Sequence, residues 1–196
     1  MSELTFEEIV DRCVSENLDL DISNGDAAHA RYLFQKLFET SKKNVIIYSK
    51  QFSNYDDDEK KVPLWGAENV VQAAKDFLSE PGRVLKLISS KSDIDGLDKN
   101  TFVRSLVEDT NRKGNIELTL PKEAISFKNF FIVSDEKAYR FALTDRETKA
   151  IANFNDKPSA QVLSKAFQGT IDNLIQSKTR KFGKTFNRAD TKLSFN

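Results

Sequence analysis

The sequence contains very little of the residue types that build disulfides and metal sites. Among 196 residues there is one cysteine, Cys13, and one histidine, His29. A lone cysteine cannot form a disulfide within the chain, which fits a reducing compartment. A structural zinc site needs several cysteine or histidine ligands. We therefore expect no internal disulfide, no such metal site, and a cytoplasmic location.

Glycine is also scarce, and long apolar runs are missing. The seven glycines form no phosphate-binding loop, no G-x-G-x-x-G fingerprint and no G-x-S-x-G elbow, so we expect no nucleotide cofactor. The richest apolar runs, 45–48 and 129–133, are far shorter than the roughly 20 residues that span a bilayer. The first eight residues lack the basic-then-apolar pattern of a secretory signal. We expect no membrane insertion.

Charge of either sign is not in excess. Lys and Arg total 30, Asp and Glu total 30, and the formal net charge is +0. The whole chain therefore gives no reason to expect a polyanionic partner, and any basic surface must be local.

The first 120 residues alternate between helical and strand periodicity. Helical spacing of apolar residues is found near 5–17, 27–41, 67–78 and 102–107, and compact apolar runs typical of strands are found at 45–48, 84–88 and 116–120. Strands that alternate with helices of this length favour right-handed crossovers onto a mostly parallel sheet.

The organisation changes after Pro121. Segments 130–133 and 138–142 flank the polar turn 134–137, which predicts an antiparallel hairpin. A short strand near 150–154 and a last helix from about 158 follow. The sequence thus predicts an α/β fold: a mixed, mostly parallel sheet with helices on both faces and a C-terminal antiparallel hairpin. We divide the chain into an N-terminal helix and linker (1–25), one α/β domain (26–176) and a flexible basic tail (177–196).

The tail combines basic side chains with interspersed aromatic rings. Asp190 is the only acidic residue in this segment, and phenylalanines lie between the basic residues. Such a segment can grip phosphates and stack bases of single-stranded nucleic acid, can order on a protein partner, or can serve as a solubilising end. The candidate contact residues are Lys178, Arg180, Lys181, Lys184 and Arg188.

The element order, together with segment 130–141, resembles the catalytic half-domain of the phospholipase D superfamily. In that family a hairpin strand carries a His, a Lys two residues later and an Asp five residues after the Lys. If Asp135 matches that Asp, Phe130 stands at the Lys position and Lys128 at the His position. The resemblance thus implies a fold whose two reactive side chains are replaced, because neither an ammonium nor a phenyl ring can act as the nucleophilic imidazole.

Several polar residues near the hairpin and the first central strand form a candidate anion-accepting cleft. They are Ser49, Gln51, Lys128, Asp135, Arg140, Lys149 and Asn153. Those after the first strand stand where open α/β sheets usually place ligands. Ordinary surface polarity near turns is the simpler alternative for the set.

These observations favour a non-catalytic, phospholipase D-like binding or regulatory module. It would act through the anion-accepting cleft or a protein partner, or as a homodimer, since half-domains of the family commonly pair. One alternative is an atypical nuclease or phosphodiesterase centred on Lys128, Asp135 and Arg140. Another is a nucleic-acid-binding accessory protein that uses the basic tail.

Overall fold

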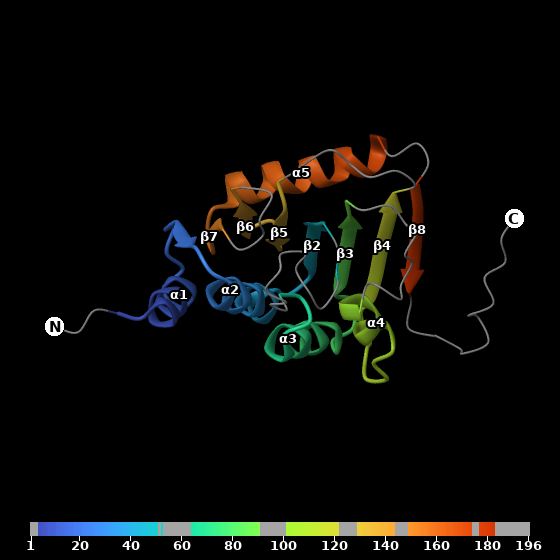
Figure 1. Ribbon diagram of the computed structural model, residues 1–196, viewed down its shortest axis with the longest axis horizontal. Coiled ribbons are helices and arrows are strands. Elements are labelled where there is room, and N and C mark those ends of the chain that lie inside the picture. Colours follow the sequence, from blue (N-terminus) through green and yellow to red (C-terminus); the bar gives the residue numbers. More distant parts are fainter. Residues whose placement is uncertain are drawn as a thin grey trace, which may run out of the picture.

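The computed structural model describes residues 4–50, 52, 64–90, 101–121, 129–143, 149–173 and, for the backbone, 177–182. These residues form one mixed α/β sheet with helices on both sides (Figure 1). The helices are α1 (Phe6–Ser15), α2 (Ala27–Thr40), α3 (Glu68–Leu78), α4 (Thr101–Val107) and α5 (Lys157–Asn173). The strands are β1 (Ile22–Asn24), β2 (Asn44–Ser49), β3 (Val84–Ser89), β4 (Asn115–Pro121), β5 (Phe131–Ser134), β6 (Ala138–Ala142), β7 (Ala150–Asn153) and β8 (Ser177–Phe182).

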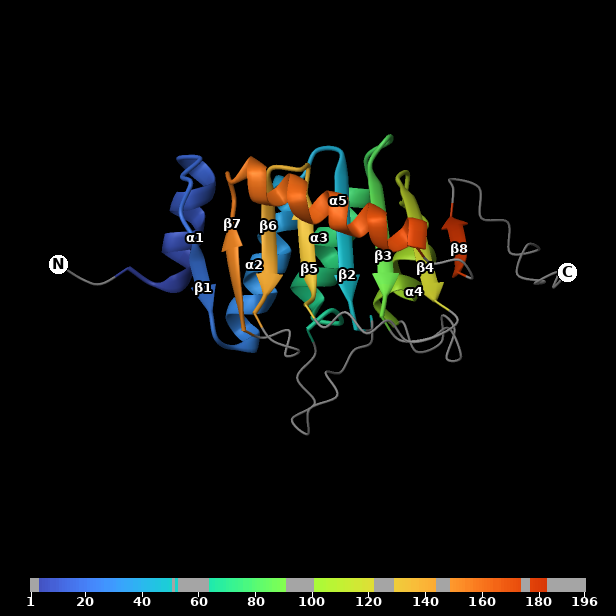
Figure 2. The same cartoon turned by 90° about the horizontal axis from the view of Figure 1, so that it is seen from above.

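The strands form a single sheet in the order β1-β7-β6-β5-β2-β3-β4-β8 (Figure 2). Parallel pairing joins β2 to β3 and β3 to β4, where α3 and α4 provide the crossovers. All other pairings among the described strands are antiparallel. The mixed sheet, the helices on both faces and the hairpin are thus confirmed. Parallel pairing, however, is confined to β2, β3 and β4. The hairpin strand β5 pairs antiparallel with β2, and β6, β7 and β1 follow it in the sheet, each antiparallel to its neighbour.

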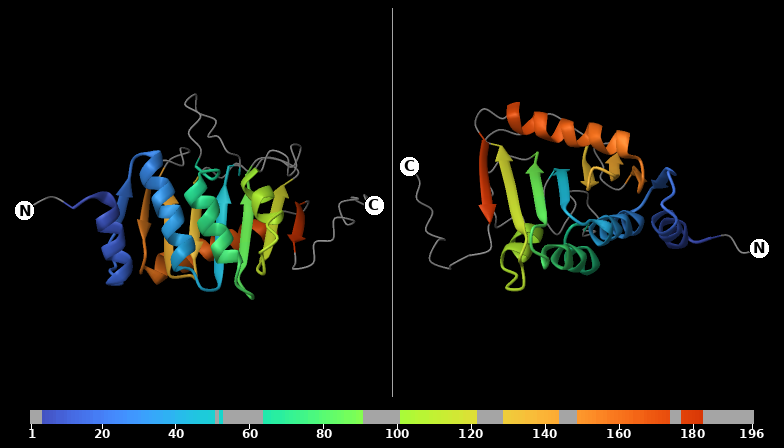
Figure 3. Two further views of the ribbon diagram at one scale, coloured as in Figure 1. Left: turned by 90° about the horizontal axis from the view of Figure 1, so that it is seen from below. Right: turned by 180° about the vertical axis from the view of Figure 1, so that it is seen from behind.

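The helices are divided unequally between the two faces of the sheet. Helices α1 to α4 cover one face, and α5 alone crosses the other (Figures 1 and 3). On the α1–α4 face the buried aromatic side chains include Phe34, Phe38, Phe52, Phe77 and Phe102, together with Trp65. On the α5 face a smaller core forms around Tyr48, Phe130, Phe131 and Phe167. The abundance of phenylalanine therefore serves packing on both faces.

The N-terminal segment belongs to the domain instead of preceding it. Helix α1 begins with the capping box expected from the sequence, in which Thr5 Oγ1 accepts from Glu8 N and Glu8 Oε2 accepts from Thr5 N. Asp11 accepts a 2.8 Å hydrogen bond from Tyr32 Oη on α2, and β1 pairs with β7. The boundary drawn at residue 25 is therefore corrected: α1 and β1 share the core of the sheet.

The start of the basic tail is also corrected. Residues 177–182 form β8, which pairs antiparallel with β4 along its whole length and closes that edge of the sheet. Without β8, the backbone N–H and C=O groups on that side of β4 would lack partners. The hydrogen bonds gained by pairing outweigh the tendency of a charged segment to remain in water. The remainder of the predicted tail, with Lys184 and Arg188, lies outside the described residues.

Candidate functional site

The carboxyl ends of β2 and β3 meet at the edge where ligands were expected. Ser49, at the end of β2, is fully buried, and its Oγ accepts a hydrogen bond from Trp65 Nε1 at 3.2 Å. Ser89, at the end of β3, donates from Oγ to the carbonyl of Lys50 at 2.9 Å. Both side chains are buried, and these hydroxyl groups hold neighbouring segments together.

Aromatic rings pack against one another at the same edge, on the α5 face. Phe130, which stands at the family's Lys position only if Asp135 matches its Asp, is 6% exposed and stacks on Tyr48 with the ring centroids 5.9 Å apart. Tyr48 also stacks on Phe131 at 5.7 Å. Burial raises the pKa of Tyr48 to about 12, so the phenol stays protonated at neutral pH. The rings make this part of the edge apolar.

Asp135 lies at the opposite end of β5, in the turn to β6. The turn has φ values of 51° at Asp135 and 52° at Glu136, and Lys137 N donates to Ser134 O at 3.0 Å. The Asp135 carboxylate accepts from the backbone N–H groups of Lys42, Lys43 and Asn44 and from the hydroxyl of Ser41. It therefore fixes the loop between α2 and β2. Its contacts explain the turn.

Arg140 points to the other face of the sheet. Its side chain is 2% exposed, its guanidinium lies 4.8 Å from the ring centroid of Phe34, and its Nε donates to Asn24 Oδ1 at 3.3 Å. Asn153, 1% exposed, donates to Asp19 and Asp21 in the segment before β1. Both side chains connect β1 and its preceding segment to the sheet.

Among the described residues, the proposed cleft residues are not all brought together. Ser49 is at the carboxyl edge of β2, Asp135 is at the other edge, and Arg140 and Asn153 are on opposite faces. Lys149 is exposed beside the start of β7, at the same edge as Ser49. Gln51 and Lys128 lie outside the described residues, as do Lys184 and Arg188 of the tail. Strand β8 includes Lys178, Arg180 and Lys181, of which the structure describes the backbone.

The single histidine is not near Asp135. His29 is in the first turn of α2, where its ring stacks on Phe6 with the centroids 3.8 Å apart and its Nδ1 lies 3.4 Å from Asp26. Asp135 contacts the loop that follows the other end of this 14-residue helix. At 1.5 Å per residue the helix spans roughly 20 Å.

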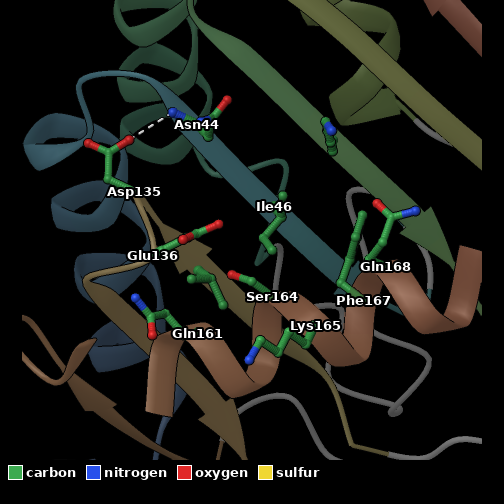
Figure 4. A pocket seen from close by; sticks show the side chains of 11 residues that line it. Asn44, Ile46, Asp135, Glu136, Gln161, Ser164, Lys165, Phe167 and Gln168 are labelled. Carbon is green, nitrogen blue, oxygen red and sulfur yellow. Dashed lines mark hydrogen bonds between the residues drawn. The ribbon is translucent and has the colours of Figure 1, made fainter. Parts of the chain in front are cut away.

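A different cavity opens between α5 and the sheet (Figure 4). It has a volume of about 550 Å³, and we name it the α5 cavity. Its lining comprises Asn44, Ile46, Lys86, Val133, Asp135, Glu136, Gln161, Ser164, Lys165, Phe167 and Gln168. Of these only Asp135 was a predicted site residue. One signal for the others was present: Lys86 interrupts the apolar run 84–88 in a strand expected to be covered on both faces.

Neither a metal cluster nor a membrane span is found in the part of the chain that the structure describes. No group of three or more His, Cys, Asp or Glu residues there is arranged to hold a metal ion. No helix among these residues is both long enough and apolar enough to cross a bilayer.

No protein-family model matches this chain, and no curated protein matches it in sequence. Solved structures do match. NucT from Helicobacter pylori is similar with a TM-score of 0.52 and 11% identity, over 78% of this chain and 94% of that one. NucT has a phospholipase D-like fold, and so does this chain. The likeness is one of fold.

Two longer proteins are similar at a lower score. TrmBL2, an archaeal chromatin protein with a novel mode of DNA binding, gives a TM-score of 0.49 and 14% identity over 85% of this chain. Phosphatidylserine synthase from Haemophilus influenzae gives a TM-score of 0.49 and 12% identity over 82% of this chain. This chain covers 59% of the first protein and 39% of the second.

Proposed function

We propose that this chain is a non-catalytic binding module built on a phospholipase D-like fold. The observation that carries the proposal is the packing of Phe130 against Tyr48. At the position where the resemblance implies a charged Lys, the chain has a buried ring within an apolar cluster. A phosphoryl group brought there would lose its hydration and gain no opposite charge from that ring.

The chain also has no side chain that could replace the nucleophilic histidine of the phospholipase D superfamily. The only imidazole belongs to His29, which stacks on Phe6 and lies close to Asp26. Lys128 occupies the matching His position, and an ammonium at neutral pH has no lone pair with which to attack phosphorus. The atypical phosphodiesterase centred on Lys128, Asp135 and Arg140 is disfavoured, because the Asp135 carboxylate is bonded to the loop before β2 and the Arg140 guanidinium is bonded to Asn24.

Hydrolysis assays test this proposal. The intact chain is incubated with bis(p-nitrophenyl) phosphate and with single-stranded DNA, each with and without a chelator. We expect turnover no greater than that of the buffer. A turnover that is lost in Lys128→Ala, or in His29→Ala, and retained in the control Lys75→Ala on α3 would overturn the proposal.

The second candidate is nucleic-acid binding through the basic C-terminal segment. Strand β8 contributes Lys178, Arg180 and Lys181 to the outer edge of the sheet, and Lys184 and Arg188 follow it directly. A segment rich in Lys and Arg suits a phosphate backbone, and such binding weakens steeply with salt. The basic composition of this segment supports it as a candidate contact surface for nucleic acid.

Fluorescence anisotropy with a labelled single-stranded oligonucleotide tests this candidate. We expect affinity that falls with salt and is reduced at least tenfold when residues 183–196 are removed and Lys178, Arg180 and Lys181 are changed to Gln. The Gln substitutions leave the β8 backbone in place, so the β4 edge is not exposed. Affinity unchanged by these alterations would reject the basic segment as the binding surface.

A further inference from the structure

The floor of the α5 cavity follows from the register of the strands. Val133, Ile46 and Lys86 are directly paired across β5, β2 and β3, so their side chains share the α5 face. Val133 and Ile46 line an apolar patch, and Phe167 of α5 adds a buried ring beside it. The cavity therefore has an apolar centre.

Opposite charges lie on the two sides of this centre. Glu136, at the β5–β6 turn, lines one side and Lys86, on β3, lines the other. Strands β5 and β3 are two strand spacings apart, about 10 Å. Within the described residues, no hydrogen bond or ion pair engages the side chain of Glu136 or that of Lys86.

The Asp135 carboxylate is less available to a ligand than the carboxylate of Glu136. Its two carboxylate oxygens already accept hydrogen bonds from Lys42, Lys43, Asn44 and Ser41. Lys165 lies at the α5 rim and adds a second cation to the cavity lining (Figure 4). The free acid on this lining is therefore Glu136, and the two lysines come from other elements.

Ser164 adds a hydroxyl that lacks a partner. Its Oγ is buried and has no hydrogen-bond partner among the described residues, and Figure 4 shows the side chain directed from α5 into the cavity near Ile46. A buried polar group without a partner is costly, and a ligand atom that bonds to it recovers that cost. A hydroxyl can donate to a carboxylate and can also accept from an N–H group.

We propose that the α5 cavity binds a short zwitterionic peptide. The ammonium group lies at Glu136, the carboxylate lies at Lys86 with the peptide also bonded to Ser164 Oγ, and apolar side chains cover Ile46 and Val133. Two extended residues span at most about 7 Å, a length comparable with the distance of about 10 Å between the strands β5 and β3. The inference rests on the proposed function, because it identifies the ligand class of a module that binds without turnover.

Titration calorimetry with L-alanyl-L-leucine tests the inference. The N-acetylated dipeptide lacks the ammonium group, the C-terminal amide lacks the carboxylate, and inorganic phosphate is an anion without an apolar body. We expect the unmodified dipeptide to bind at least about tenfold more tightly than each modified form and than phosphate, because each charged group has its own partner.

Matched variants assign the two ends of the ligand. Glu136→Gln is expected to abolish the preference for the free ammonium and to keep the preference for the carboxylate, and Lys86→Gln is expected to do the reverse. Ser164→Ala weakens binding of every form. Lys75→Gln, which changes a similarly half-buried lysine on the opposite face, leaves all affinities unchanged. Thermal unfolding of each variant checks that the fold is retained.

The outcomes separate this inference from the proposed function. Equal binding of the three peptide forms, absence of peptide binding, or phosphate binding as tight as that of the unmodified dipeptide would each overturn the zwitterion site. Turnover of a phosphodiester counts against the proposed function alone, since it is measured on a different substrate and depends on Lys128 or His29. The calorimetric titration decides the ligand class in either case.

Discussion

Asp135 and Asn44 hold each other through two reciprocal hydrogen bonds. The backbone N–H of Asp135 donates to the carbonyl of Asn44 at 2.9 Å, and the backbone N–H of Asn44 donates to Asp135 Oδ1 at 2.7 Å. This pair joins the β5–β6 turn to the start of β2, across 91 positions of sequence. It aligns the antiparallel hairpin with the parallel half of the sheet.

Asp135→Ala should lower the free energy of unfolding by about 2 kcal/mol, because three backbone N–H groups and one hydroxyl lose a charged acceptor. Asp135→Asn retains one acceptor oxygen and should lose about half as much. Urea unfolding of both variants measures the effect. Asp76→Ala, which removes an acceptor for the exposed side chain of Gln72, is the control. Equal losses for Asp76→Ala and Asp135→Ala would contradict the role assigned to the turn.

Glu136→Gly should stabilise the fold by about 0.5 to 1 kcal/mol. Glu136 has a φ of 52°, a left-handed conformation that is unfavourable for a residue with a side chain and favourable for glycine. Thermal unfolding measures the change. Glu136→Val should destabilise the protein, because a β-branched residue fits this conformation poorly. If glycine proved less stable than valine, the assigned turn geometry would be incorrect.

Phe130→Lys restores the residue that the family resemblance implies, and it should not restore hydrolysis. Placing an ammonium among Tyr48, Phe131 and the other rings should cost about 3 kcal/mol, whereas Phe130→Leu should cost about 1 to 2 kcal/mol. Leu143→Lys is the matched control, since Leu143 is 52% exposed and should tolerate the charge. A Phe130→Lys variant as stable as Leu143→Lys would show that the edge is open to water.

Alkaline pH should weaken the fold through Tyr48 and Tyr139. Burial raises the pKa of each phenol to about 12, above the value of about 10 in an unfolded chain. The folded state therefore favours the protonated phenol. Its contribution is fully present below about pH 10 and is lost as the pH rises toward 12.

Urea unfolding between about pH 9 and 12 measures this dependence, and the Tyr48→Phe variant isolates one phenol. Its stability should decline less steeply than that of the natural chain, because lysine deprotonation affects both proteins alike. Parallel slopes for the two proteins would contradict the raised pKa of Tyr48.

The main elements could be predicted because their signals are local. The helical spacing in α2 and the compact run at Val45 depend only on neighbouring residues, and both elements are confirmed. Strand β1 was missed because it has three residues, too few to show a period, and it forms through pairing with β7. Strand β8 was missed because its charge indicated a tail, whereas the open edge of β4 decides its conformation.

The candidate site was harder to predict than the fold. The turn at Asp135 was expected from residue preferences, but its partners Lys42 and Asn44 are more than 90 positions away. The position of Arg140 near the hairpin predicts a ligand contact, but the alternation of the strand instead directs its side chain toward the ring of Phe34. Ser164 gave no sequence signal, since a serine on a helix is ordinarily exposed to water.

The pairing of β1 with β7 constrains the order in which the chain is assembled. Ile22 lies beside Ala152, so the first strand has no neighbour until some 130 later residues have been made. Closing so large a loop carries a substantial entropic penalty, which delays contacts between distant segments. During synthesis the α1–β1 segment emerges from the ribosome long before its place in the sheet exists, so stable folding awaits the hairpin and the strand that follows it.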